Sequence, residues 1–148
     1  MPHSYTANHV HVVFSTHERR KQISADLKPR LWAYMAGVGR NHELVIHEVG
    51  GHDDHAHVLM SLPASKSLSS AIQTLKAVSS KWIHEDGARE FQWQEGFGAF
   101  SVSESNMQRV QQYIQNQEEH HRKISFEEEF RALLRRHGIA FDEKFVFG

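Results

Sequence analysis

The sequence predicts an α+β fold of the ferredoxin-like, or split βαβ, type: a four-stranded antiparallel sheet with extra C-terminal helices. Two observations carry this prediction. Segments with strand and helix patterns follow one another as strand, helix, strand, strand, helix, strand, which is the order of a split βαβ unit. Because crossover connections are right-handed, we expect the first and third strands to be neighbours at the centre of the sheet.

The first half of the chain contains three predicted strands and one predicted helix. The strands are apolar or β-branched runs at residues 9–15, 44–49 and 55–62. Apolar residues at helical spacing over 27–38 predict a helix, with Ser24 or Asp26 as its N-cap. The second and third strands form a hairpin in which Gly50-Gly51 is expected to be the turn.

The second half adds one strand and three helices. Ser67 is expected to cap a long helix whose apolar stripe ends at Trp82. Residues 98–103 predict the fourth strand. A third helix, capped by Ser105 or Asn106, is followed by a final helix over 126–137.

The composition excludes several kinds of chemistry. Of the 148 residues, 39% are hydrophobic and 24% charged, as in an ordinary soluble globular domain. Cysteine is absent, which excludes disulfides, thiolate metal sites and cysteine nucleophiles. The N-terminus lacks the apolar core of a signal peptide and no run can span a bilayer, so we expect a cytoplasmic protein. A net charge of −1 argues against coating nucleic acid by bulk charge, but allows a local basic face.

Two of the 13 histidines, His55 and His57, stand one residue apart at the start of an apolar run. In an extended strand alternate side chains leave the same face. Both imidazoles should therefore point one way, with Ala56 and Val58 on the opposite face. Two neutral imidazole nitrogens on a rigid strand can bind one divalent ion. Two ligands do not complete a metal site, so the rest of the chain must supply another.

The helix after the fourth strand offers that ligand and a reacting group. Tyr113 and Gln117 are four residues apart, which places them on one helix face. A tyrosine hydroxyl can attack phosphorus and form a covalent link to DNA once a divalent cation neutralises the phosphate charge. The amide oxygen of Gln117 can bind the same cation. With His55 and His57, these side chains have the chemistry needed to cleave and rejoin DNA.

The same residues, and the segments around them, resemble a known family. His55-Ala56-His57 matches a His-hydrophobe-His motif, and residues 110–121 match a helix that carries a single tyrosine. Further similar segments are residues 75–82, 93–102 and 138–143. The chain resembles, over nearly its whole length, the HUH-type single-tyrosine transposases of the IS-two-hundred-like class, which move insertion sequences as single-stranded DNA.

The resemblance implies one HUH endonuclease domain over residues 1–148, a DNA transposase that cleaves and rejoins single-stranded DNA at insertion-sequence ends. It implies that Tyr113 attacks a phosphodiester, giving a 5′-phosphotyrosine intermediate and a free 3′-hydroxyl. It also implies that His55, His57 and Gln117 bind Mg²⁺ or Mn²⁺. The expected partners are DNA hairpins and a second copy of the chain, in whose site the tyrosine can act in trans. Ala56 is smaller than the family's usual residue, which affects packing more than ligation.

The resemblance also implies a bacterial or archaeal cell, with the protein acting on nucleoid DNA. Other functions stay open at this stage. The chain can be a domesticated or inactive hairpin-DNA-binding protein of the same fold. A replication or conjugation relaxase shares the metal motif, but is usually larger. A metal-binding protein without a DNA role would leave Tyr113 unexplained.

Several residues have two interpretations. His9-Val10-His11 spells the same motif as His55-Ala56-His57 on the neighbouring predicted strand. His120 and His121 are expected to be solvated or to contact DNA, with metal ligation as the minority interpretation. His52-Asp53 are expected to form a turn or to support the metal histidines. Trp82 and Trp93 are expected to pack in the core rather than to stack on bases. Six cations are candidates for phosphate contacts, with a solvated surface equally good for each: Arg19, Arg20, Lys21, Arg40, Lys76 and Lys81.

Overall fold

The structure is a computed structural model that describes residues 4–147, so the ends of the predicted domain, residues 1–3 and 148, lie outside the described residues. Its strands are β1 (His9–Ser15), β2 (Val45–His52), β3 (His55–Ser61) and β4 (Gly98–Val102). They form one sheet in the order β2-β3-β1-β4, and every neighbouring pair is antiparallel. β1 and β3 are therefore the central pair, and the ferredoxin-like prediction is confirmed.

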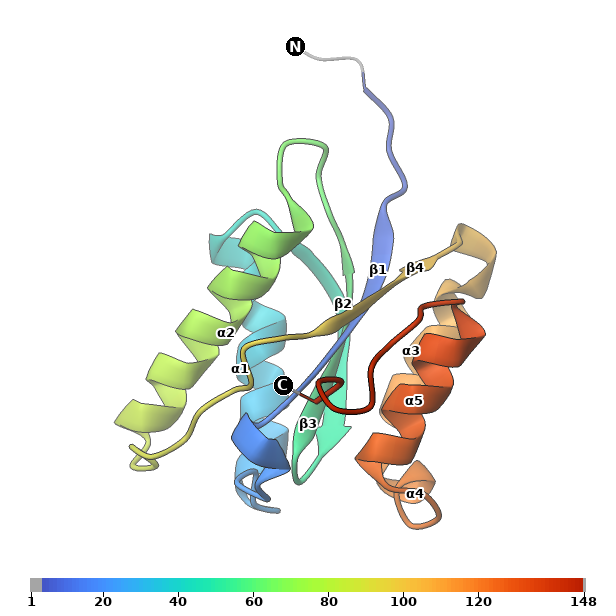
Figure 1. Ribbon diagram of the computed structural model, residues 1–148. Helices are drawn as coiled ribbons and strands as arrows, with labels where there is room; N and C mark the ends of the chain where they lie inside the picture. Colours follow the sequence, from blue (N-terminus) through green and yellow to red (C-terminus); the bar gives the residue numbers. More distant parts are fainter. Residues whose placement is uncertain (1–3, 148) are drawn as a thin grey trace.

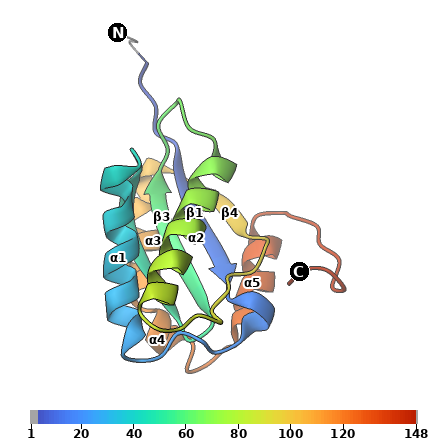
Figure 2. The same cartoon turned by 90° about the vertical axis from the view of Figure 1, so that its left-hand side faces the viewer.

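Helices cover both faces of this sheet (Figure 1). One face is covered by α1 (Leu27–Asn41) and α2 (Leu68–Glu85), which stand side by side in front of the strands in Figure 2. The other face is covered by α3 (Met107–Gln115), α4 (Gln117–His120) and α5 (Phe126–Arg136). The short 3-10 turns η1 (His17–Arg19) and η2 (Glu104–Asn106) follow β1 and β4. Within residues 4–147, no helix combines the length and the apolarity needed to cross a membrane.

Serine side chains cap α2 and α5, and Ser24 accepts a backbone hydrogen bond in the turn before α1, whose N-cap residue Asp26 makes no side-chain cap bond. The Leu27 backbone N–H donates to Ser24 Oγ at 3.1 Å before α1, and the Ser70 backbone N–H donates to Ser67 Oγ at 3.1 Å at the start of α2. α5 begins with a capping box in which Ser125 and Glu128 each accept a hydrogen bond from the other's backbone N–H. Each face of the sheet is thus covered by at least one helix with a serine cap at its start.

The alternation of side chains along the central strands divides them between the two faces of the sheet. Phe14, Ala56 and Val58 are fully buried in the large core beneath α1 and α2. His55 and His57 leave the opposite face, toward α3, α4 and α5, as predicted. The sheet therefore separates an apolar core from a polar site.

Trp93 and Trp82 pack against the core, as predicted, Trp93 buried and Trp82 half-buried. The Trp93 ring lies edge-on to Phe14 with ring centroids 4.8 Å apart, and its indole N–H donates to Ser79 Oγ at 3.0 Å. The Trp82 ring stacks on Tyr34 at 4.8 Å. The loop before β4 is thereby fixed against α2.

The turn between β2 and β3 differs from the prediction. Gly50-Gly51 as the turn is wrong, because these residues pair with His57 and Ala56 inside the β2–β3 ladder. The turn is formed instead by Asp53 and Asp54. The physical reason is the close approach of α3: a Cβ on Gly50 would lie 2.6 Å from the Ile114 carbonyl oxygen. The glycine permits α3 to lie directly on the histidine-bearing hairpin.

We expect Gly50→Ala to destabilise the fold and to displace α3, because the added methyl group overlaps the Ile114 backbone. Overpacking of this kind costs about 1–3 kcal/mol, which urea denaturation measures directly. Gly37→Ala is the matched control, since a Cβ there meets nothing within 4 Å. In the interior of α1 that change should stabilise by about 0.5–1 kcal/mol. Equal effects of the two substitutions would contradict the close-approach explanation.

Candidate active site

β3 holds both predicted metal histidines beneath the C-terminal helices. His55 and His57 are 0% exposed, and their ring centroids are 5.0 Å apart. His55 Nδ1 lies 2.8 Å from Asp54 Oδ1, so the carboxylate orients the ring and leaves Nε2 facing the helices. His55 and His57 therefore present their Nε2 atoms to the same buried space.

Gln117 reaches this space from the start of α4. Its Oε1 lies 3.0 Å from His55 Nε2, and its side chain is buried. The helix predicted to carry both Tyr113 and Gln117 is not continuous, because α3 ends at Gln115 and Asn116 has φ −97° and ψ 19°. The interruption turns the chain while leaving Tyr113 and Gln117 against a common neighbour, Glu129.

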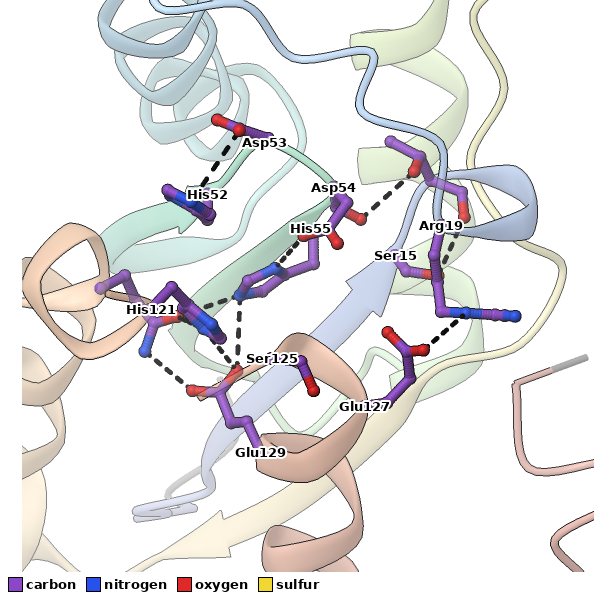
Figure 3. A network of polar contacts seen from close by, with 12 residues as sticks. Ser15, Arg19, His52, Asp53, Asp54, His55, His121, Ser125, Glu127 and Glu129 are labelled. Carbon is purple, nitrogen blue, oxygen red and sulfur yellow. Dashed lines mark hydrogen bonds and ion pairs between the residues drawn. The ribbon is translucent and has the colours of Figure 1, made fainter. Parts of the chain in front are cut away.

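Glu129, from α5, is the common partner of the cluster, and Figure 3 shows its contacts with His55 and His121. Its Oε1 is 3.1 Å from His57 Nε2, 3.1 Å from His121 Nε2 and 3.4 Å from His55 Nε2. Its Oε2 accepts a hydrogen bond from Gln117 Nε2 at 3.0 Å. Glu129 is only 2% exposed, and a buried carboxylate is costly unless charged or polar groups surround it. The imidazoles and the amide satisfy that requirement.

Tyr113 joins the cluster through the same carboxylate. Its hydroxyl donates a short hydrogen bond to Glu129 Oε2, and it lies 3.5 Å from His120 Nε2. The Tyr113 ring stands edge-on to His57 with centroids 5.7 Å apart. One buried side chain, Glu129, therefore connects the predicted nucleophile to both predicted metal histidines.

Burial and charge set the protonation of the cluster. Burial disfavours the imidazolium of His55, but contacts with Asp54 and Glu129 outweigh it and raise the pKa of His55 to about 9. Burial also acts against the Glu129 carboxylate, yet His57, His121 and His55 hold its pKa far below the usual range. Burial, reinforced by the Glu129 charge, raises the pKa of Tyr113 well above the usual value for a phenol. In the metal-free protein Tyr113 is therefore a neutral hydrogen-bond donor to a carboxylate.

The two histidines of the competing motif, His9-Val10-His11, have different neighbours in the structure. His9 turns away from the cluster, with its Nδ1 2.6 Å from Ser61 Oγ and its Nε2 3.1 Å from Glu104 Oε1. His11 borders the cluster, because its Nε2 lies 2.8 Å from His57 Nδ1. Burial, followed by the neighbouring His57, lowers the pKa of His11 to about 3. His11 is thus a neutral hydrogen-bond partner for His57.

Two members of the cluster were not among the metal ligands predicted from the sequence. His121 was expected mainly in solvent or on DNA, with ligation only as a minority interpretation, but its side chain is 2% exposed and its Nδ1 lies 2.9 Å from the Ile124 carbonyl oxygen. No periodic signal surrounds it. Glu129 did leave a signal: it shares the buried face of α5 with Phe126, Phe130 and Leu133. A carboxylate at an apolar position of an amphipathic helix is the pattern that indicates a buried functional acid.

The donor atoms of the cluster fit a divalent cation. Ligand atoms of His55, His57, His121 and Glu129 all lie within 4.8 Å of one another. Gln117 Oε1 adds an amide oxygen, 2.9 Å from His121 Nε2. Magnesium prefers oxygen ligands, whereas imidazole nitrogens together with carboxylate oxygens suit a transition-metal cation. Of the two ions expected from the sequence, Mn²⁺ matches this donor set better.

The six predicted phosphate-binding cations lie on several elements. Arg19 and Lys21, around η1, line a cavity of about 400 Å³ that also reaches His121. Arg20 pairs with Glu18 beside them. Lys76, on α2, is half-buried and donates to the carbonyl oxygens of Gln94 and Gly96 at 2.8 and 2.7 Å. The two others are exposed on α1 and α2: Arg40 and Lys81.

The fold and this cluster define a class of protein: a ferredoxin-like domain with a histidine pair on its central strand and a tyrosine on a helix above it. Residues 4–117 match the family described as IS200-like transposases. The chain belongs to that family of transposases. The match ends at Gln117 and so does not include His121 or Glu129.

Two solved structures share the fold. A candidate transposase from Deinococcus radiodurans R1 has 18% identity and a TM-score of 0.63, covering 79% of this chain and 96% of that one. A REP-associated tyrosine transposase bound to a REP hairpin has 18% identity and a TM-score of 0.60, covering 82% of this chain and 73% of that one. A comparison with curated proteins found no match.

In the metal-free protein we expect His55 to titrate near pH 9, measured by NMR of the imidazole nitrogens. Because this pKa lies above the ordinary 6.5, the imidazolium stabilises the fold fully below about pH 6.5, and that contribution disappears as pH rises through about 9. Glu129→Gln should lower the pKa of His55, since it removes the carboxylate. Glu128→Gln, an exposed change on the same helix that keeps the cap, should not. An unchanged His55 pKa in Glu129→Gln would refute the coupling.

Proposed function

We propose that this transposase cleaves and rejoins single-stranded DNA through Tyr113, with a divalent cation bound beside it. One observation carries the proposal: Glu129 contacts the Tyr113 hydroxyl with one oxygen and His57 Nε2 with the other. A phenol fixed against a buried group of metal-binding side chains is suited to attack on a phosphodiester. Membership of a transposase family supports the same reaction class.

In the proposed reaction the Tyr113 oxygen attacks phosphorus. As the phenol gives up its proton, a bond from phosphorus to the tyrosine oxygen forms and the bond from phosphorus to the 3′-oxygen breaks, so the proton lost by the phenol is balanced by the one that the leaving oxygen gains. The products are a 5′-phosphotyrosine and a 3′-hydroxyl, which takes up a proton as it leaves. Attack by the 3′-hydroxyl of another strand on the phosphotyrosine reverses these bond changes and rejoins DNA. Glu129 orients the phenol for the first step by accepting its hydrogen bond.

We propose His55, His57 and Gln117 as metal ligands, with Glu129 and His121 completing the set. Their donor atoms converge in one buried space, and imidazoles and carboxylate favour Mn²⁺ over Mg²⁺. A bound cation would neutralise phosphate charge and polarise the scissile phosphodiester. Asp54 and His11 position the ligand rings, because each contacts the second nitrogen of one histidine.

DNA hairpins at the ends of an insertion sequence are the proposed substrate. The solved relative bound to a REP hairpin supports this choice. We further propose one domain over residues 1–148, cytoplasmic action on nucleoid DNA, and a homodimer. The contact of Tyr113 with Glu129 of its own chain supports cleavage in cis rather than in trans. A hairpin-binding protein that no longer cuts is the alternative, and the intact set of reactive side chains argues against it.

Tyr113→Phe should reduce covalent adduct formation about 10³-fold or more, because the attacking oxygen is gone, while hairpin binding is retained. The assay incubates labelled single-stranded hairpin DNA from the flanks of the gene with protein and Mn²⁺, followed by a denaturing gel. EDTA and His57→Ala should each abolish the adduct of the wild-type protein. Equal loss of binding and adduct in Tyr113→Phe would contradict the nucleophile assignment. Hairpin binding by the wild-type protein without any adduct would favour the non-cutting alternative.

Mixing two inactive variants tests cis against trans cleavage. Tyr113→Phe lacks the nucleophile and His57→Ala lacks a metal ligand, so a mixed dimer contains one intact copy of each. If each tyrosine serves its own chain, as we propose, the mixture should stay inactive in the adduct assay. Recovery of about a quarter to half of wild-type activity would instead establish a site completed by the partner.

A further inference from the structure

A cavity of about 340 Å³ opens beside Tyr113, and no residue of η1 lines it. Its lining comes mainly from α3, from β4 and from the C-terminal end of α5. Tyr113 forms part of its wall, together with Arg109 from α3 and Arg136 from α5. No member of the metal-binding cluster other than the adjoining Tyr113 is needed to form it. The cavity therefore gives an approach to the nucleophile that is separate from the buried ligands.

The charge of this cavity is positive. Among residues 4–147 neither Arg109 nor Arg136 has an ion pair or a side-chain hydrogen bond, and both are exposed. Two other arginines of the C-terminal part of the chain are paired with carboxylates, Arg131 with Glu143 and Arg122 with Glu119. No aspartate or glutamate lines the cavity. Two free guanidinium groups beside a nucleophile are suited to bind phosphate oxygens.

The inner wall of the cavity is apolar and aromatic. Phe100, from β4, stacks on His137 with ring centroids 4.5 Å apart, and Leu133 lies beside them. Ring faces and aliphatic side chains suit a nucleobase and a sugar, while the arginines suit the backbone. The volume of about 340 Å³ lies at the lower end of the range for small-molecule pockets, about 300–1,000 Å³. One unpaired nucleotide fits that size better than a base pair does.

We propose that this cavity, formed by Arg109, Arg136, Phe100 and His137 beside Tyr113, binds the nucleotide adjoining the scissile phosphate in single-stranded DNA. This inference rests on the proposed function, since it takes Tyr113 as the nucleophile. The guanidinium groups bind flanking phosphates, and the Phe100–His137 wall contacts the base. Such contacts would align the scissile phosphodiester with the Tyr113 oxygen. The cavity would thereby contribute to selection of the cleavage position.

Binding of a fluorescein-labelled single-stranded oligothymidylate, measured by anisotropy over a range of salt concentrations, tests the proposal. Tyr113→Phe is the background, so that cleavage does not remove the probe. Arg109→Ala and Arg136→Ala should each weaken binding several-fold. Each should also flatten the slope of log K against log salt by about 0.7, the amount that one neutralised phosphate contributes in a single strand. Unlabelled duplex of the same length should compete poorly.

Arg135→Ala is the matched control. Arg135 precedes Arg136 on the same helix and carries the same charge, but it faces the Phe141 ring at 5.7 Å and does not line the cavity. It should leave affinity and slope unchanged. If Arg109→Ala and Arg136→Ala behave like Arg135→Ala, the cavity does not bind DNA and the proposal is overturned.

The adduct assay, run with Tyr113 intact and Mn²⁺ present, separates this proposal from the proposed function. Loss of oligothymidylate binding in the two cavity variants, with no adduct in the wild-type protein, would support the cavity and refute the transposase chemistry. Adduct formation at the wild-type rate in both variants, with unchanged binding, would support the chemistry and refute the cavity. Thermal denaturation of each variant shows whether the fold is retained.

Discussion

The buried carboxylate of Glu129 is the constraint on which the rest of the site depends. It is 2% exposed and is surrounded by imidazoles, an amide and a phenol that come from β3, α3, α4 and the loop after α4. Removing any one partner would leave a charged group less well compensated in the protein interior, where that is costly. The contacts that compensate the charge of Glu129 also bring the side chains of the candidate site together. Stability of the cluster and alignment of its chemistry therefore have one physical cause.

Strand and helix periodicity in the sequence predicted most of the fold. The alternation of His55, Ala56 and His57 correctly assigned the two faces of β3, because one face had to be apolar to bury α1 and α2. The predicted turn at Gly50-Gly51 was wrong for a definite physical reason. Glycine is typical of turns, but Gly50 lies in a strand, where its missing side chain leaves room for the backbone of Ile114. That tertiary contact is one that no local pattern encodes.

The candidate site was predictable only where its residues are close in sequence. His55 and His57 share a strand, and Tyr113 and Gln117 share one segment, so their spacing was informative. His121 and Glu129 are far from His55 and His57 in sequence, and only the fold of the chain after α4 brings them close in space. The pair His9 and His11 shows the converse: an identical motif, one strand away, is divided because the sheet gives the two residues different neighbours.

The position of Glu129 after all four strands, α3 and α4 has a consequence for folding during synthesis. A ribosome releases the strands, Tyr113 and Gln117 before α5, so the nascent protein lacks the carboxylate that joins them. Until α5 has emerged and docked, the phenol has no acceptor and the buried imidazoles have no counter-charge. A polypeptide made only as far as α4 therefore leaves Tyr113, His55 and His57 without their common partner. The cluster is complete only once α5 has docked on the sheet.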